Sequence, residues 1–176
     1  RVEGDIHRYT WRDVAARARQ VANALDGLKL GFSDRVATLA WNGYRHLELY
    51  FGVSGSGRVL HTINPRLHPD QIVWIANHAE DQVLFFDMSF LPIVQAVHAR
   101  CTTVKHWVAL CDADKLPADT GIPNLLSYEA LIGKQNGGSM PSSSTDDGNL
   151  NYRKKYDNYS TIAKVIGEVR LEKDGF

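Results

Sequence analysis

The chain has 176 residues, of which 44% are hydrophobic and 10% aromatic, so it can bury the core of one domain of ordinary size. Twenty Lys and Arg residues balance twenty Asp and Glu residues, and a chain with zero formal net charge has no broad field to attract nucleic acid or an anionic membrane. Nucleic-acid binding is therefore disfavoured, and no apolar run approaches the roughly 20 residues that a membrane-spanning helix needs.

The first predicted element is a helix that begins after Thr10. Thr10 can cap this helix, and Asp13 can complete a capping box. Apolar residues then recur at helical spacing, which predicts a stripe that faces a core. The members of this stripe are Trp11, Val14, Ala15, Ala18, Val21, Ala22, Leu25 and Leu28.

Further along the chain, short apolar segments alternate with helical ones. We expect the next helix to be capped by Asn42, another to begin at Pro69, a third to be capped by Ser89, and a short last one to run from Ser127 to Leu131. The apolar segments between them predict buried strands at 35–41, 59–63, 83–86 and 104–110.

Strands that are apolar throughout and separated by helices indicate a doubly wound α/β domain, with a mainly parallel sheet and helices on both faces. We expect this subdomain to occupy residues 1–133. Residues 134–151 are rich in Gly, Ser, Asn and Asp without apolar periodicity, which predicts a flexible linker. Residues 152–176 form a charged tail of unknown origin, for which an edge strand and a short amphipathic helix are both open.

Two cysteines are too few for a disulfide framework and lack the spacing of a metal site. Cys111 ends an apolar run, which predicts a buried thiol. We therefore expect a reducing compartment and a cytoplasmic location. The chain begins at Arg1 without an initiating Met or a signal peptide, which predicts a fragment or a trimmed chain.

Few motifs in the sequence carry chemistry. Gly55-Ser56-Gly57 follows a predicted helix and precedes a predicted strand, whereas a phosphate loop follows a strand and opens a helix, so a turn is favoured. The seven histidines have no metal-ligand or protease spacing, and no GxSxG, P-loop or kinase motif occurs. We therefore predict no catalytic and no metal-binding residue in this chain.

Position in the predicted sheet still indicates binding residues, because ligands of doubly wound sheets bind beyond the carboxyl ends of the strands. Asn64 and Arg66 follow the second strand, and Pro65 fixes the backbone beside a guanidinium that suits a phosphate or carboxylate. We predict that Asn64 and Arg66 bind a cofactor, with a purely structural turn as the alternative. Trp41 and Asn42 follow the first strand, and we predict that they bind substrate.

Several stretches resemble the core motifs of the adenylate-forming enzymes. Residues 8–14 look like the first core motif, and Ser-Asp-Arg-Val at 33–36 resembles the family's Gly-Asp-Arg-Val turn into a strand. Residues 57–67, with His-Thr-Ile-Asn-Pro-Arg-Leu at 61–67, resemble the second core motif in the form typical of fatty acyl-CoA ligases, although Arg58 replaces a small residue. Asn-His-Ala-Glu-Asp at 77–81 and Phe-Phe-Asp at 85–87 continue the order, so the resemblance covers about residues 5–133.

The resemblance implies an enzyme that activates a carboxylic acid with ATP and Mg²⁺ and transfers the acyl group from AMP to coenzyme A. The implied acid is a medium- or long-chain fatty acid or a related short thioether or aromatic acid, and a homodimer remains open. The family's ATP loop, its aromatic-Gly-x-Thr-Glu motif, its adenosine-binding Asp and its distal catalytic Lys do not occur in this sequence. Such groups meet the charge on the transferring phosphoryl group.

We therefore expect the amino-terminal fragment of an acid–thiol ligase that is inactive alone and holds no cofactor of its own. One alternative is a non-catalytic binding or subunit-interaction module. Another is a free-standing flavodoxin-like nucleotide binder.

Overall fold

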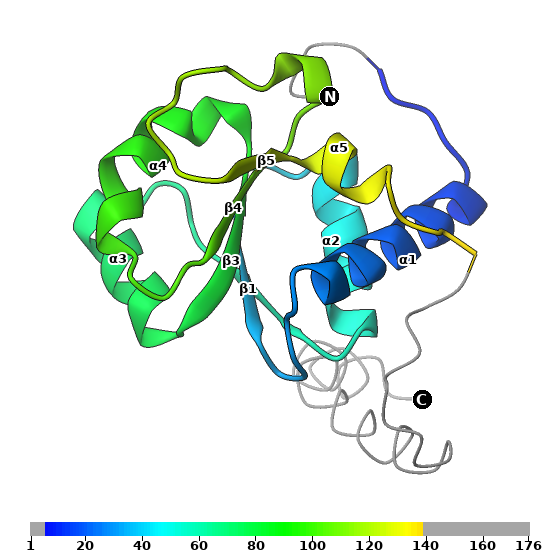
Figure 1. Ribbon diagram of the computed structural model, residues 1–176, viewed down its shortest axis with the longest axis horizontal. Coiled ribbons are helices and arrows are strands. Elements are labelled where there is room, and N and C mark those ends of the chain that lie inside the picture. The colour runs from blue at the N-terminus through cyan, green and yellow to red at the C-terminus, as the bar shows by residue number, and fades with distance from the viewer. Residues whose placement is uncertain (1–5, 139–176) are drawn as a thin grey trace, which may run out of the picture. The chain divides into compact units, whose positions relative to one another are not determined.

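The computed structural model describes residues 6–138, and its centre is a sheet of five parallel strands in the order β2-β1-β3-β4-β5 (Figure 1). Parallel pairing places Val36 of β1 opposite Leu60 of β2 on one side and Val83 of β3 on the other. The strands are β1 (Arg35–Leu39), β2 (Val59–Thr62), β3 (Asp81–Phe86), β4 (His106–Ala109) and β5 (Leu125–Ser127).

Helices cover both faces of the sheet, as the sequence predicts for a doubly wound α/β domain. One face carries α1 (Trp11–Gly27), α2 (Tyr44–Gly55) and α5 (Tyr128–Ile132), and the other carries α3 (Pro69–His78) and α4 (Leu91–Val97) (Figure 1). Short 3-10 turns lie at Met88–Phe90, His98–Arg100 and Ala113–Lys115. None of the helices within residues 6–138 is long and apolar enough to cross a membrane.

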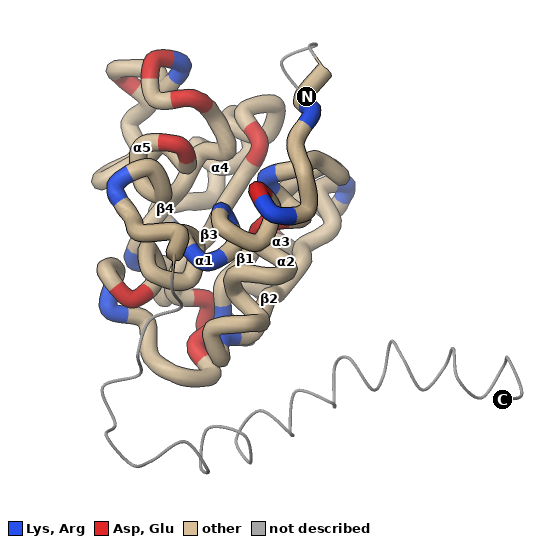
Figure 2. Tube along the Cα trace, turned by 90° about the vertical axis from the view of Figure 1, so that its right-hand side faces the viewer, with Lys and Arg blue, Asp and Glu red and all other residues tan. Residues whose placement is uncertain are grey.

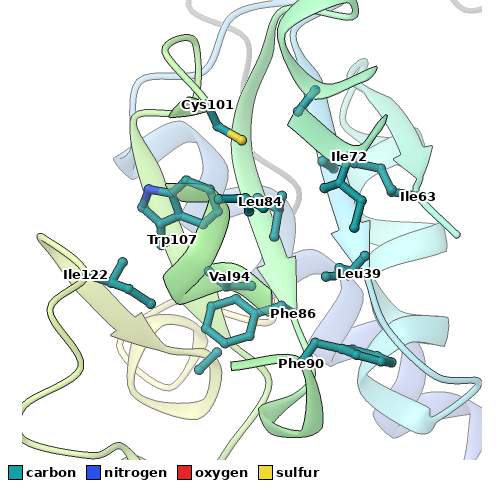
Figure 3. Packing of buried hydrophobic residues seen from close by; sticks show 14 of the residues in the cluster. Leu39, Ile63, Ile72, Leu84, Phe86, Phe90, Val94, Cys101, Trp107 and Ile122 are labelled. Atoms are coloured by element: carbon teal, nitrogen blue, oxygen red, sulfur yellow. The ribbon is translucent and has the colours of Figure 1, made fainter. Parts of the chain in front are cut away.

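The alternation of side chains along β3 builds a core on each face. Leu84 and Phe86 join Val94 and Trp107 in the core beneath α3 and α4 (Figure 3), while Phe85 belongs to the core beneath α1, α2 and α5. Each large apolar side chain buried in this way contributes about 1.5–3 kcal/mol. Strands buried on both faces are therefore apolar throughout, which is why they could be recognised in the sequence.

Helices α1 and α2 approach closely where Gly52 faces α1. A Cβ atom at this position would lie 2.6 Å from Val21 Cβ and 2.7 Å from the Ala18 carbonyl oxygen. The close contact requires glycine, because any side chain would push the two helices apart.

Several predicted helix ends are confirmed. The Thr10 hydroxyl accepts a hydrogen bond from the Asp13 amide at 3.3 Å, and the Asp13 carboxylate accepts one from the Thr10 amide at 2.8 Å, which completes the capping box. Pro69 opens α3, and Ser127 caps α5 by accepting a bond from the Ala130 amide.

Other predictions at helix ends are wrong. Asn42 does not cap α2, because the N-cap is Gly43, which makes no side-chain capping bond. Ser89 does not cap α4, because the chain first forms a 3-10 turn closed by a bond from the Phe90 amide to the Asp87 carbonyl, so the helix begins later. In α1, Trp11 is 74% exposed and Ala15 is exposed as well, so neither belongs to the core-facing stripe.

Helix α2 is apolar on two faces. Leu49 and Val53 are buried against the sheet, but Leu47, Tyr50 and Phe51 point away from it and are 37%, 45% and 52% exposed. Their spacing of three and four residues places them on one stripe of the helix. We call these three residues the outer face of α2.

The predicted linker at residues 134–151 is described only as far as residue 138, and the predicted tail at 152–176 lies outside the described residues.

Candidate functional site

The carboxyl edge of the sheet has a topological switch point between β1 and β3, because the chain passes from β1 to β2 on one side and then to β3 on the other. Trp41, which follows β1, bridges this point. Its amide donates to the Asp87 carboxylate at 2.5 Å, and its indole Nε1 donates to the Ser89 hydroxyl at 2.9 Å. Its ring, 43% exposed, packs on Phe90 at 4.9 Å between centroids.

A buried histidine supports the segment that holds Trp41 and Asn42. His46 Nδ1 lies 3.1 Å from the Trp41 carbonyl oxygen, and His46 Nε2 lies 3.1 Å from the Thr38 hydroxyl. Burial lowers the pKa of His46, so its imidazole is neutral near pH 7. Because a carbonyl only accepts, Nδ1 carries the proton and Nε2 accepts from Thr38. This side chain was not among the residues that the sequence predicted, and Asn42 beside it is exposed.

Asn64 and Arg66 lie at the same edge, beyond β2. The Ile63 amide donates to the Thr38 carbonyl at 2.8 Å, so Asn64 is the first residue past the paired part of the strand. The Asn64 side-chain oxygen accepts a bond from the Arg66 amide at 3.0 Å, which makes a local turn, and both residues are exposed. Within residues 6–138, the side-chain hydrogen bonds of this turn and those of Trp41 do not connect.

A second cluster, which the sequence did not reveal, is centred on Glu129 of α5. Arg17 of α1 makes a two-pronged ion pair with the Glu129 carboxylate at 2.9 and 3.0 Å. Arg45 donates to the same carboxylate at 2.8 Å, and the Tyr44 hydroxyl donates at 3.1 Å. Arg45 also reaches the end of β4, where it bonds to the Leu110 carbonyl at 3.1 Å and to Asp112 at 2.6 Å.

The cluster extends to Glu48, which is fully buried in α2. Its carboxylate accepts bonds from Arg17 Nε and from the Tyr128 hydroxyl, both at 2.7 Å. Burial raises the pKa of Tyr128, and the Glu48 charge raises it further, so the hydroxyl stays protonated and donates. Because several donors satisfy each carboxylate, the cluster ties α1, α2, α5 and the end of β4 together.

The described residues show neither a metal site nor a glycine-rich phosphate loop. Within residues 6–138, no three His, Cys, Asp or Glu side chains gather as a metal site requires. The Gly55-Ser56-Gly57 segment is the turn from α2 into β2, with Gly57 at a φ of 84°, as its placement in the sequence predicts. We therefore assign no step that uses Mg²⁺ or ATP to these residues.

Charged residues of both signs are interspersed along the trace in the view of Figure 2. This distribution agrees with the zero formal net charge and gives no stripe of a single sign in that view.

Comparisons with known proteins identify relatives for most of the chain. The AMP-binding enzyme family matches residues 2–149, and a family of unknown function, DUF1302, matches residues 127–176. The 3-methylmercaptopropionyl-CoA ligase of Ruegeria lacuscaerulensis is 49% identical over 130 residues, which are 74% of this chain and 24% of that protein. The medium-chain-fatty-acid–CoA ligase of Ectopseudomonas oleovorans is 47% identical over 131 residues, again 74% and 24% of the two chains.

Among solved structures, an anthranilate CoA ligase in complex with anthranoyl-AMP superposes with a TM-score of 0.69 and 25% sequence identity. The match covers 77% of this chain and 25% of that one. The chain thus spans about a quarter of the length of the curated relatives it matches.

Proposed function

Because the chain belongs to the AMP-binding enzyme family, we propose that residues 1–133 are the amino-terminal α/β subdomain of an acid–CoA ligase. The observation that carries this proposal is the 47–49% identity to two CoA ligases over about a quarter of a ligase length. The parent enzyme joins a fatty or related carboxylic acid to coenzyme A through an acyl-AMP, at the expense of ATP and with Mg²⁺. The residues of this chain supply one wall of its site.

Trp41 and Asn42 are proposed to face the acid. The Trp41 ring is half-exposed beside Phe90, and its bonds to Asp87 and Ser89 fix its orientation at the switch point. A fixed aromatic surface next to polar edge groups suits a hydrocarbon that carries a carboxylate.

Asn64 and Arg66 are proposed to face a phosphate-bearing cofactor of the parent. The Asn64 turn presents Arg66 as an exposed residue beyond β2. A guanidinium binds phosphate oxygens in a bidentate manner.

The remaining proposals concern the rest of the chain and its surroundings. The DUF1302 match to residues 127–176 supports a tail whose origin differs from that of the ligase part. The burial of the two cysteines, Cys101 and Cys111, supports a reducing and cytoplasmic compartment. A homodimer stays a prediction.

A replacement experiment tests the function. The matched 131 residues of the Ectopseudomonas oleovorans ligase are exchanged for the corresponding residues of this chain, and octanoyl-CoA formation is measured. We expect an active chimera, because the segment supplies the same wall of the site. The matched control carries the corresponding segment of the Ruegeria lacuscaerulensis ligase instead. A folded but inactive chimera beside an active control would contradict the proposed function.

The isolated 176-residue chain is expected to release no pyrophosphate from ATP in the presence of Mg²⁺ and octanoate. Adenylation requires fixed cations and amides around the transferring phosphoryl group, and the family's ATP loop and distal Lys, which supply them, do not occur in this sequence. Acid-dependent pyrophosphate release by the purified chain would show that it is an enzyme in its own right.

A further inference from the structure

After α5 the chain crosses α1, where three successive main-chain carbonyls accept bonds from side chains of that helix. Gln20 Nε2 donates to the carbonyl of residue 135 at 3.1 Å, Asn23 Nδ2 to that of residue 136 at 2.6 Å, and Arg19 Nε to that of residue 137 at 2.6 Å. These three donors lie on neighbouring turns of α1 and meet a segment more than 110 residues further along the chain.

The fit also depends on the lack of a side chain at Gly137. A Cβ atom there would lie 3.1 Å from the Ala16 carbonyl oxygen and 3.4 Å from Gln20 Cγ. Contacts of this length force the neighbour to move, and a helix carbonyl has little freedom to do so. The segment thus lies directly on the α1 backbone, at a distance that glycine permits.

Local hydrogen bonds stabilise the segment at its start, at residue 135, and at its end, at residue 138. The Gln135 amide donates to the Ile132 carbonyl at 2.9 Å, and the Gly138 amide donates to the Asn136 side chain at 2.7 Å. Upstream, Glu129 of α5 is already bound to Arg17 of α1. One helix therefore holds both α5 and the residues that follow it.

We propose that Arg19, Gln20 and Asn23 form an anchor site for main chain, and that this site fixes where the polypeptide leaves the α/β subdomain. Because the bonds go to main-chain carbonyl groups, the site does not depend on which side chains the segment carries. It requires only that the residue at 137 is small. The first four residues of the predicted linker, 134–137, consequently belong to the folded subdomain. In the proposed ligase, whose function this inference assumes, α1 then holds the residues that follow α5 as part of the subdomain.

Cleavage at Lys134 by endoproteinase Lys-C tests the anchor site in the full chain. Lys134 is exposed and directly precedes the anchored segment. A protease can cut a bond only when several residues on each side of it detach from the fold, so cleavage here reports release of the segment. Cleavage after Lys115, in an exposed 3-10 turn, serves as the internal reference, and mass spectrometry identifies the fragments.

We expect the double variant Arg19→Ala/Asn23→Ala to raise the cleavage rate at Lys134 about tenfold, because two bonds that close the segment are lost. The rate at Lys115 should stay unchanged. Arg12→Ala, an exposed arginine of the same helix, is the matched control and should leave both rates unchanged. An equal rate at Lys134 in the double variant and the control would overturn the proposal.

Gly137→Val tests the same site without touching a donor, and it should also accelerate cleavage at Lys134. Its control is Gly138→Val, where the added carbon meets mainly the Asn136 side chain, at 3.1 Å. If both valine variants are cleaved like the unmodified chain, the anchor site is wrong. These measurements involve no ligase activity, so their failure is distinct from a failure of the chimera.

Discussion

At the scale of single residues, Glu129 is the centre of the charged cluster that joins α1, α2 and α5. Its carboxylate accepts bonds from Arg17, Arg45 and Tyr44, and its side chain is 22% exposed. Removing one partner of a largely buried ion pair leaves the other charges uncompensated in a poorly solvated place.

Replacement of Glu129 by glutamine is therefore expected to lower the free energy of unfolding by about 2–4 kcal/mol, measured by urea denaturation. The matched control is Glu80→Gln. Glu80 also pairs with an arginine, Arg35 at 2.7 Å, but its side chain is 70% exposed, so the change should be within about 1 kcal/mol. Equal effects of the two substitutions would mean that the Glu129 cluster contributes no more than a surface pair.

The Glu129 carboxylate is also expected to make the free energy of unfolding depend on pH. Burial by itself raises the pKa of Glu129, but the hydrogen bonds and charges of Arg17 and Arg45 outweigh it, so the pKa lies below its usual value. A carboxyl with a lowered pKa adds stability above its unfolded pKa and loses that contribution as the pH falls through its folded pKa.

We expect the difference in unfolding free energy between the unmodified chain and Glu129→Gln to be constant from about pH 6 to 8 and to shrink below about pH 4. Denaturant titrations over this range measure it. A difference that grows on acidification would contradict the assigned direction of the pKa shift.

The sequence could indicate positions at the carboxyl edge but not the contacts made there. Trp41 and Asn64 were found because they follow apolar strands, and strand ends are visible in a pattern. The pairing of Arg45 with Glu129 could not be found, because they are 84 positions apart in the chain and each is an ordinary charged residue of a helix. The available signal was that Arg45 and Glu48 lie on the inward face of α2, where an unpaired charge is costly.

At the scale of elements, the crossing of α1 and α2 depends on one glycine. Gly52→Ala is expected to lower the free energy of unfolding by about 1–3 kcal/mol, because the new methyl overlaps Val21 and the Ala18 carbonyl. Thermal or urea unfolding measures the change.

The control for this substitution is Gly27→Ala at the end of α1. A Cβ at Gly27 meets nothing within 4 Å, and alanine restricts the unfolded chain, so this variant should be neutral or more stable by up to about 1 kcal/mol. A Gly52→Ala variant as stable as Gly27→Ala would show that the helices can separate freely.

The longer helices were predictable from their helical apolar periodicity, and the first four strands from short runs that are apolar throughout. Strand β5 was missed in the sequence, because Leu125–Ser127 has only three residues. It is an edge strand that pairs with β4. The caps at Asn42 and Ser89 were wrong for a common reason. A polar residue near a helix start suggests a cap, but the residue that occupies the N-cap depends on how the chain leaves the preceding strand.

At the scale of the whole molecule, the outer face of α2 is an apolar stripe that is exposed within residues 6–138. Leu47, Tyr50 and Phe51 form one stripe, whereas Trp74 of α3 is an exposed aromatic residue on the other side of the sheet. Contiguous exposed apolar side chains bind hydrophobic dyes and promote association.

The double variant Leu47→Lys/Phe51→Lys is expected to reduce the fluorescence of bound anilinonaphthalene sulfonate at least twofold, with no loss in the free energy of unfolding beyond about 0.5 kcal/mol. Trp74→Lys, the control, should reduce the dye signal less. Unchanged dye binding in the α2 variant would mean that the signal comes from elsewhere.

The central position of β1 has a consequence for how the chain acquires its structure. Strand β1 comes first in the sequence but pairs with both β2 and β3, and Val36 meets Val83, which lies 47 positions further along the chain. During synthesis β2 can pair with one edge of this strand first, but the other edge stays open until β3 has left the ribosome. Non-local parallel pairing of this kind is slow, so the waiting time exposes the nascent chain to aggregation and to chaperones.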